Sequence, residues 1–161
     1  MARPAKIKAA SVGNGTALYL GQHVRQVDHG RVILPVEWRP DASPRDFTVI
    51  SWPVLAPEYL LVLPPSRWEV LQRDLEARST ADEETAEIER SISSRICLSS
   101  LDRYGRLPLP EEVLKGLGIE KEATLVGRIN KFEVWNTSRF TATLANTKPQ
   151  LIATALKSIR I

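Results

Sequence analysis

One short pattern occurs twice in this chain, and the repeat limits the possible folds more than any other feature. Residues 30–35 (Gly-Arg-Val-Ile-Leu-Pro) reappear as residues 105–110 (Gly-Arg-Leu-Pro-Leu-Pro), with Gly, Arg, an apolar residue, Leu and Pro at matching places. Residues 60–68 return in the same order as residues 132–140. We therefore predict one domain that is built from two related halves.

Each copy of the pattern predicts a tight turn, a strand and then a helix. Gly30 and Gly105 can adopt the positive φ that a tight turn between two short strands requires. The strand that follows each glycine leads into a helix, and Pro40 cuts this helix short in the first copy. Further strands are expected over residues 47–52, 59–63, 123–129 and 132–135.

A longer helix is expected at the end of each half. Residues 66–69 (Ser-Arg-Trp-Glu) match a capping box, which predicts a helix that begins at Ser66. The corresponding helix of the second half is expected to begin at Ser138 and to bury Phe140 and Leu144. Near the chain end, Ile152, Ala155, Leu156 and Ile159 share one helical face, which favours packing on the body or on a neighbouring subunit.

These elements predict five segments along the chain. They are a flexible N-terminal arm (residues 1–16), a first half-module (17–78), an acidic helical linker (79–91), a second half-module (92–145) and an amphipathic C-terminal helix (146–161). Residues 82–90 contain five acidic residues and one Arg, a net charge of −4. Since the whole chain carries +3, the other 152 residues sum to +3 − (−4) = +7. The modest overall charge therefore hides a basic remainder.

Several classes of function are disfavoured by composition and motifs. One Cys and two His cannot form a disulfide or a Cys/His zinc site within one chain, so no metal or cofactor is expected. The chain lacks P-loop, Rossmann, zinc-protease and nucleophile-elbow motifs, so we expect neither an enzyme nor a small-molecule substrate. The apolar runs are too short to cross a bilayer, so no membrane partner is expected and the protein is placed in the cytoplasm.

The sequence resembles the MraZ family, which are bacterial transcriptional regulators made of two SpoVT-AbrB-type half-modules. The resemblance covers residues 17–145, and residues 125–135 (Leu-Val-Gly-Arg-Ile-Asn-Lys-Phe-Glu-Val-Trp) are its most specific part. Residues 102–106 also satisfy the family pattern Asp-x-x-Gly-Arg. In the first half, Asp28 lies three rather than four residues before Arg31, which suggests a turn one residue shorter.

This resemblance implies an α+β fold of two tandem SpoVT-AbrB-like half-modules with swapped β-hairpins. The halves would form one pseudo-twofold domain with helices after each half. The resemblance also implies a ring-shaped homo-oligomer that binds double-stranded DNA at direct repeats upstream of its own operon. Such a protein would repress its own division and cell-wall gene cluster and would lie in the cytoplasm, at the nucleoid.

The expected DNA-binding residues cluster around the two Gly-Arg turns. Arg31 and Arg106 follow the turn glycines, so their guanidinium groups can project toward phosphate oxygens or guanine edges. The full expected set is Arg25, His29, Gly30, Arg31, Arg103, Gly105 and Arg106. Asp28 and Asp102 are expected to shape the turns, because phosphate repels a carboxylate.

Other interpretations of the same residues stay open. An arginine after a turn is often a solvated strand residue or the partner of a nearby Asp, and the four tryptophans suit core or interface positions better than base stacking. The chain as a whole also fits an AbrB-like protein-interaction or antitoxin-type module. A third alternative is a ring protein with a purely structural role.

Overall fold

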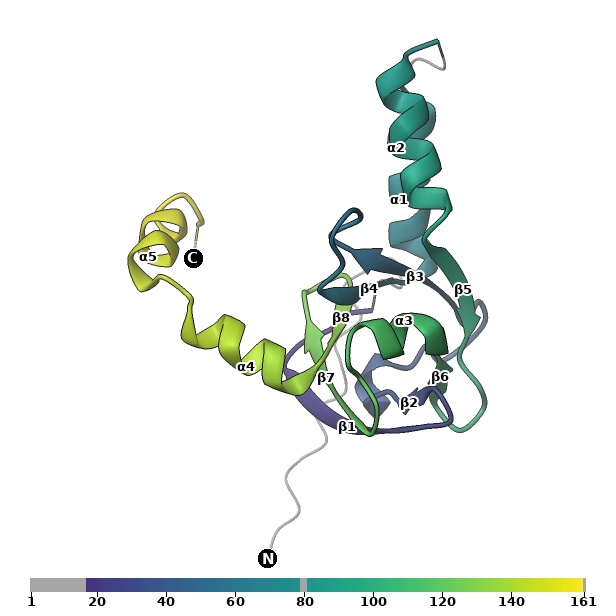
Figure 1. Ribbon diagram of the computed structural model, residues 1–161, viewed down its shortest axis with the longest axis vertical. Helices are drawn as coiled ribbons and strands as arrows, with labels where there is room; N and C mark the ends of the chain where they lie inside the picture. Colours follow the sequence, from purple (N-terminus) through teal and green to yellow (C-terminus); the bar gives the residue numbers. More distant parts are fainter. Residues whose placement is uncertain (1–16, 79–80, 161) are drawn as a thin grey trace, which may run out of the picture.

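Eight antiparallel strands form one sheet that curls into a nearly closed barrel (Figure 1). The computed structural model describes residues 17–78 and 81–160, so the expected N-terminal arm lies outside the described residues. The strand order is β5-β3-β4-β8-β7-β1-β2-β6. The strands at the two ends of this order, β5 and β6, lie close to each other, and the Ser99 hydroxyl of β5 donates to the Pro108 carbonyl of β6 at 2.5 Å.

The two halves contribute equivalent elements in the same order, except that the second half begins with an additional helix and has an α-helix where the first half has a 3₁₀ helix. The first half contains β1 (Gln22–Asp28), β2 (Arg31–Ile33), a 3₁₀ helix (Val36–Trp38), β3 (Asp46–Trp52), β4 (Tyr59–Leu63) and α1 (Pro65–Glu76). The second half contains α2 (Glu83–Ser93), β5 (Ile96–Ser100), β6 (Arg106–Pro108), α3 (Glu111–Gly116), β7 (Glu122–Gly127), β8 (Phe132–Trp135) and α4 (Thr137–Ala145), and α5 (Pro149–Leu156) follows. The α+β class is therefore confirmed.

The strands of the two halves are exchanged, as the resemblance implied. β1 of the first half pairs with β7 of the second, and β5 of the second half pairs with β3 of the first. β2 pairs with β6 and β4 pairs with β8, so equivalent strands of the two halves are neighbours at two places in the sheet. Val32 faces its repeat equivalent Leu107, and Leu61 faces its equivalent Glu133. A pseudo-twofold axis thus passes between these two residue pairs.

Aromatic rings fill the interior of the barrel. Trp38 has its ring centre 5.5 Å from that of Tyr19 and 5.0 Å from that of Phe132, and Phe47 lies 5.9 Å from Phe132. All four side chains are buried. Since edge-to-face and tilted contacts of this kind add to the hydrophobic gain, the cluster holds strands from both halves together.

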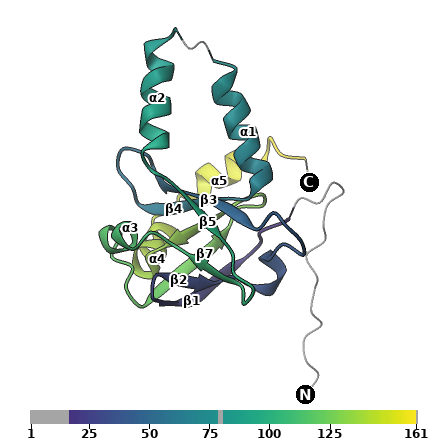
Figure 2. The same cartoon turned by 90° about the vertical axis from the view of Figure 1, so that its right-hand side faces the viewer.

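The helices α1 and α2 project together from one side of the barrel (Figure 2). α1 begins at Pro65 without a side-chain cap, so the expected capping box at residues 66–69 is wrong. Proline suits the first helical position because its missing N–H would have no partner there. α2 carries a true cap, since the carboxylate of Asp82 accepts from the N–H of Glu84 at 3.1 Å.

The last two helices extend away from the barrel (Figure 1). Asn136 caps α4, and Phe140 is buried as expected, but Leu144 is 49% exposed, so its expected burial is wrong. α5 does not pack on the body, because its apolar residues Ile152 and Leu156 are 51% and 45% exposed. In the part of the chain that the structure describes, no helix is long and apolar enough to cross a bilayer.

Replacement of Leu107 by Ala should lower the free energy of unfolding by about 2–5 kcal/mol, because this fully buried side chain packs on the pseudo-twofold axis. Urea unfolding measures the loss. Leu98→Ala is the matched control, since Leu98 is 71% exposed. This control should change stability by less than about 0.5 kcal/mol. Equal losses in the two variants would contradict the described core.

Candidate nucleic-acid interface

The turn between β1 and β2 contains two residues. Asp28 pairs with Arg31, while His29 and Gly30 between them have φ values of 50° and 70°. Positive φ at both central positions is typical of a type I′ turn, whose twist matches that of the flanking strands. A glycine here therefore meets a conformational requirement, and it lets the Glu111 side chain approach closely.

Residues 101–105 separate β5 from β6, and three of them, 103–105, form the turn between the bonded residues Asp102 and Arg106; Gly105 has φ 79°. The N–H of Gly105 donates to the carbonyl of Asp102 at 3.1 Å, and the N–H of Asp102 donates to the carbonyl of Arg106 at 2.9 Å. This is the usual three-residue hairpin with glycine in the left-handed position. The strand registers make Asp28 the counterpart of Asp102, so the two turns differ by one residue at the tip.

Pairing of β2 with β6 brings the two repeated arginines to one surface. Arg31 lies opposite Pro108, and Ile33 lies opposite Arg106. Val32 and Leu107, which point the other way, are fully buried. The two arginines are therefore diagonal neighbours on the outer face, with backbones about 7–8 Å apart. We call these two strands with their turns, residues 28–33 and 102–108, the arginine ribbon.

Arg106 is held in place by its own turn. Its guanidinium Nε donates to Asp102 Oδ2 at 2.7 Å, and its backbone N–H donates to Asp102 Oδ1 at 2.9 Å. Desolvation raises the pKa of Asp102, but the hydrogen bonds from Arg106 and from the N–H of Tyr104 outweigh it and bring the pKa below its ordinary value. The carboxylate thus stays ionised and fixes the direction of the Arg106 side chain.

Tyr104 links the two arginines of the second turn, although it was not among the residues expected from the sequence. The guanidinium carbons of Arg103 and Arg106 lie 4.8 and 5.1 Å from the centre of its ring, and Arg103 donates to its hydroxyl at 2.7 Å. Both contacts are of cation–π geometry. The ring is 57% exposed, so it forms part of the surface. The Arg-Tyr-Gly-Arg sequence is the signal that points to it.

Arg31 has a different environment from Arg106. The carboxylate of Asp28 lies 2.7 Å from Nδ1 of its exposed neighbour His29, not on the arginine. Among the described residues, Arg31 forms no ion pair, and its buried Nε has no hydrogen-bond partner. The first turn therefore presents an arginine that is not ion-paired with any described carboxylate, although the Glu111 side chain lies beside the neighbouring Gly30.

Arg25 does not join the arginine ribbon. It shares the half-buried face of β1 with Val27, which lies opposite Val32, whereas Arg31 lies on the other face. Its guanidinium donates to the carbonyl of Val24 at 3.0 Å. The structure thus brings together all the expected residues of the two turns but leaves Arg25 apart from them.

Comparison with known proteins supplies the family. A family model described as "MraZ protein, putative antitoxin-like" matches residues 98–156. The chain is 30% identical over 129 residues to the "Transcriptional regulator MraZ" of Marinobacter nauticus, covering 78% of this chain and 86% of that protein. The proteins of the same name from Shewanella denitrificans (30%) and Azotobacter vinelandii (28%) each align with 66% of this chain and 71% of their own length.

The chain belongs to the MraZ family. It is thus a member of a family of transcriptional regulators, and these three relatives are not named as enzymes. The MraZ family model includes the second turn with Arg103 and Arg106. The 129-residue alignment is longer than either half, so the family likeness extends to both.

The lowered pKa of Asp102 predicts a specific dependence of stability on pH. Its unfolded-state value is about the ordinary 3.8, and its folded value is lower. The stabilisation is therefore fully present above pH 3.8 and is lost as pH falls through the folded pKa. The stabilities of wild type and Asp102→Asn in denaturant unfolding should differ at pH 6, and this difference should shrink as the pH falls below 3.8. Asp74→Asn on α1 is the control, and an equal dependence in all three proteins would contradict the described turn.

Proposed function

We propose that this protein binds double-stranded DNA through the outer face of the arginine ribbon and represses its own operon at the nucleoid. The observation that carries the proposal is the register of β2 and β6, because it sets the half-buried side chains of Arg31 and Arg106 on one outer face. Guanidinium groups bind phosphate oxygens and guanine edges with paired hydrogen bonds. The major groove, about 12 Å wide, admits a two-stranded ribbon of this kind.

The distribution of charge supports this assignment. The acidic residues 82–90 lie on and just before α2, which projects from the opposite side of the barrel to β1 and β2 (Figure 2). The arginine ribbon carries Arg31, Arg103 and Arg106 against Asp28 and Asp102, and this acidic segment does not closely neutralise it. Because salt screens charges that are more than about 10 Å apart, α2 has little effect on a phosphate at the ribbon.

The two turns have distinct proposed roles. Asp102 pre-orders Arg106, so this side chain loses little freedom on binding and suits a fixed contact to a phosphate or a base edge. Among the described residues Arg31 forms no ion pair, so its charge is available to DNA. Arg103 and His29 stand at the turn tips and suit phosphate contacts. Asp28 and Asp102 shape the turns, and Gly30 and Gly105 supply the positive φ that the turns require.

A ring of identical subunits is the proposed functional assembly. The exposed apolar residues of α5 support self-association, since such residues gain stability when another surface covers them; they are Leu151, Ile152 and Leu156. Each subunit presents only a few cationic contacts, so one ribbon binds weakly. Several ribbons on one ring can engage several direct repeats together, and affinity then arises from avidity.

Arg31→Ala should weaken binding to an operator with several direct repeats by at least about tenfold, because the variant removes from every ribbon a cation that is not ion-paired with any described carboxylate. Arg106→Ala should weaken it less, since part of that charge is already paired with Asp102. Fluorescence anisotropy at several NaCl concentrations measures both effects. The slope of log K against log salt should fall by about 0.9 for each phosphate that a variant no longer neutralises.

The matched control is Arg73→Ala, an exposed arginine on α1 far from the ribbon. It should bind like the wild type. Normal operator binding by Arg31→Ala would overturn the assignment of Arg31. A second protein that remains bound on purification, with no salt-dependent retention of DNA, would instead favour the AbrB-like interaction module. Assembly without any DNA binding at low salt would favour the structural ring.

The double variant Ile152→Glu/Leu156→Glu should reduce the size of the assembly, because charged side chains cannot be covered by an apolar surface without a large cost. Light scattering after size-exclusion chromatography measures the mass. Gln150→Glu on the same helix is the control and should keep the wild-type mass. An unchanged mass in the double variant would show that α5 is not the assembly surface, and a monomeric wild type would exclude the ring.

A further inference from the structure

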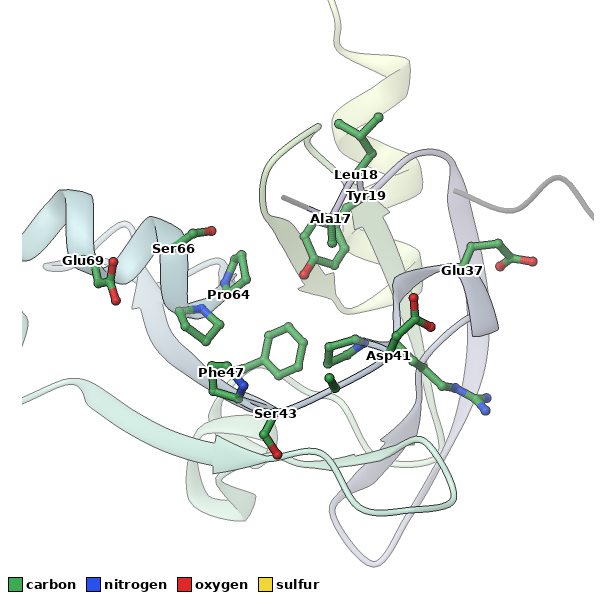
Figure 3. Close-up of a pocket in the computed structure, with 15 residues that line it drawn as sticks. Ala17, Leu18, Tyr19, Glu37, Asp41, Ser43, Phe47, Pro64, Ser66 and Glu69 are labelled. Carbon is green, nitrogen blue, oxygen red and sulfur yellow. The ribbon is translucent and has the colours of Figure 1, made fainter. Parts of the chain in front are cut away.

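A cavity of about 570 Å³ lies beside the barrel (Figure 3), and Arg39, one of its lining residues, lies against Gly105 of the arginine ribbon. Three segments form its walls: residues 17–19, the loop 39–44 after the 3₁₀ helix, and the start of α1. Its size is within the range of small-molecule sites, about 300–1,000 Å³. The proposed DNA contacts use none of the residues that line it.

The cavity arises from a difference between the two halves. In the second half, the side-chain amide of Asn136 donates to the carbonyls of Leu117 and Gly118 at 3.3 and 3.1 Å, which ties the start of α4 to the end of α3. The repeat places Pro64 at the position of Asn136, and proline has no side-chain donor. Pro40 also ends the 3₁₀ helix early, so a loop takes the place of α3 and a hollow remains.

The hydroxyl of a buried tyrosine points into this hollow. Tyr19 is 1% exposed, and its hydroxyl is directed into the cavity above Phe47 (Figure 3). No described residue makes a hydrogen bond to this hydroxyl, so it can bond to a molecule in the cavity. Burial also raises the pKa of Tyr19, so the hydroxyl keeps its proton and offers both a donor and an acceptor.

Carboxylates border the cavity on two sides of this hydroxyl. Glu69 of α1 lies on one side and Asp41 on the other, while Glu37 stands at the outer rim (Figure 3). The one cation among the lining residues is Arg39, and its guanidinium donates twice to the carbonyl of Leu34, at 3.0 and 2.8 Å. Arg39 also lies against Gly105, so its charge is directed toward the ribbon. Glu69 forms an exposed ion pair with Arg73 at 3.7 Å, and Asp41 and Glu37 form no ion pair with a described residue, so the border of the cavity is negative overall.

We propose that this cavity binds a linear organic cation with an amino group at each end, such as a diamine or a polyamine. Two separated carboxylates match two separated ammonium groups, and Phe47 with the surrounding prolines gives an apolar floor for the methylene stem. The Tyr19 hydroxyl, which borders the cavity, accepts a hydrogen bond from an ammonium N–H.

Isothermal titration of the purified full chain, without DNA, tests this site with spermidine and with cadaverine. Both should bind in a saturable manner with one molecule per chain, and 1,5-pentanediol should not bind because it lacks charge. Asp41→Asn and Glu69→Gln should each weaken spermidine binding by about fivefold, and the double variant by more than about tenfold. Both carboxylates are exposed, so these variants keep the fold.

Tyr19→Phe should also weaken binding, and Asp74→Asn, a carboxylate of α1 outside the cavity, should leave it unchanged. Failure of spermidine to saturate the wild type at millimolar concentration would overturn the proposal. Equal binding by the Asp41→Asn/Glu69→Gln double variant would overturn it as well. If the double variant instead changes the oligomeric mass while no amine binds, a basic side chain of a second copy fills the cavity and the small-cation assignment is wrong.

Discussion

The pairing of β2 with β6 is the contact on which the rest of this structure depends. Val32 and Leu107 face each other on the pseudo-twofold axis and are fully buried. Each turn glycine is also tied to the opposite half, since Gly105 accepts from the N–H of Leu34 at 2.9 Å and Gly30 accepts from that of Leu109 at 2.7 Å. Each turn thus needs the other half as a hydrogen-bond partner for its glycine carbonyl. The core and the arginine ribbon therefore form together.

This arrangement explains why two similar turns can have different electrostatic properties. The axis constrains the strands, because Val32 and Leu107 must fit one another, but the turn tips lie off the axis and are free to differ. The extra residue of the second turn gives Asp102 the reach to hold Arg106. The shorter first turn leaves Asp28 beside His29, and Arg31 forms no ion pair with a described residue. Of the two repeated arginines, Arg106 is therefore held by a carboxylate and Arg31 is not.

The sequence predicted the features that depend on local conformation and on the repeat. Gly30 and Gly105 have the positive φ that was expected, and the two halves exchange strands as the family resemblance implied. Features that depend on strand register could not be predicted from the sequence. The face on which Arg25 lies follows from the pairing of Val27 with Val32, which no local pattern determines. Leu144 fits an apolar helical face, but α4 extends beyond the barrel before that residue is reached.

The second pair of equivalent residues on the pseudo-twofold axis, Leu61 and Glu133, differs strongly in polarity. Leu61 faces Glu133, a carboxylate that is 7% exposed. An unpaired buried charge would be costly, but Trp135 Nε1 donates to Glu133 at 2.9 Å and Arg128 lies 3.1 Å from its other oxygen. The buried charge of Glu133 is thus accompanied by hydrogen-bond partners that compensate for it. Away from the axis, the first half has Pro64 where the second half has Asn136. No such compensation accompanies Pro64, and an open cavity lies there rather than a filled core. Differences between the halves therefore change the structure most in the loops, because equivalent residues of the two halves do not contact each other there.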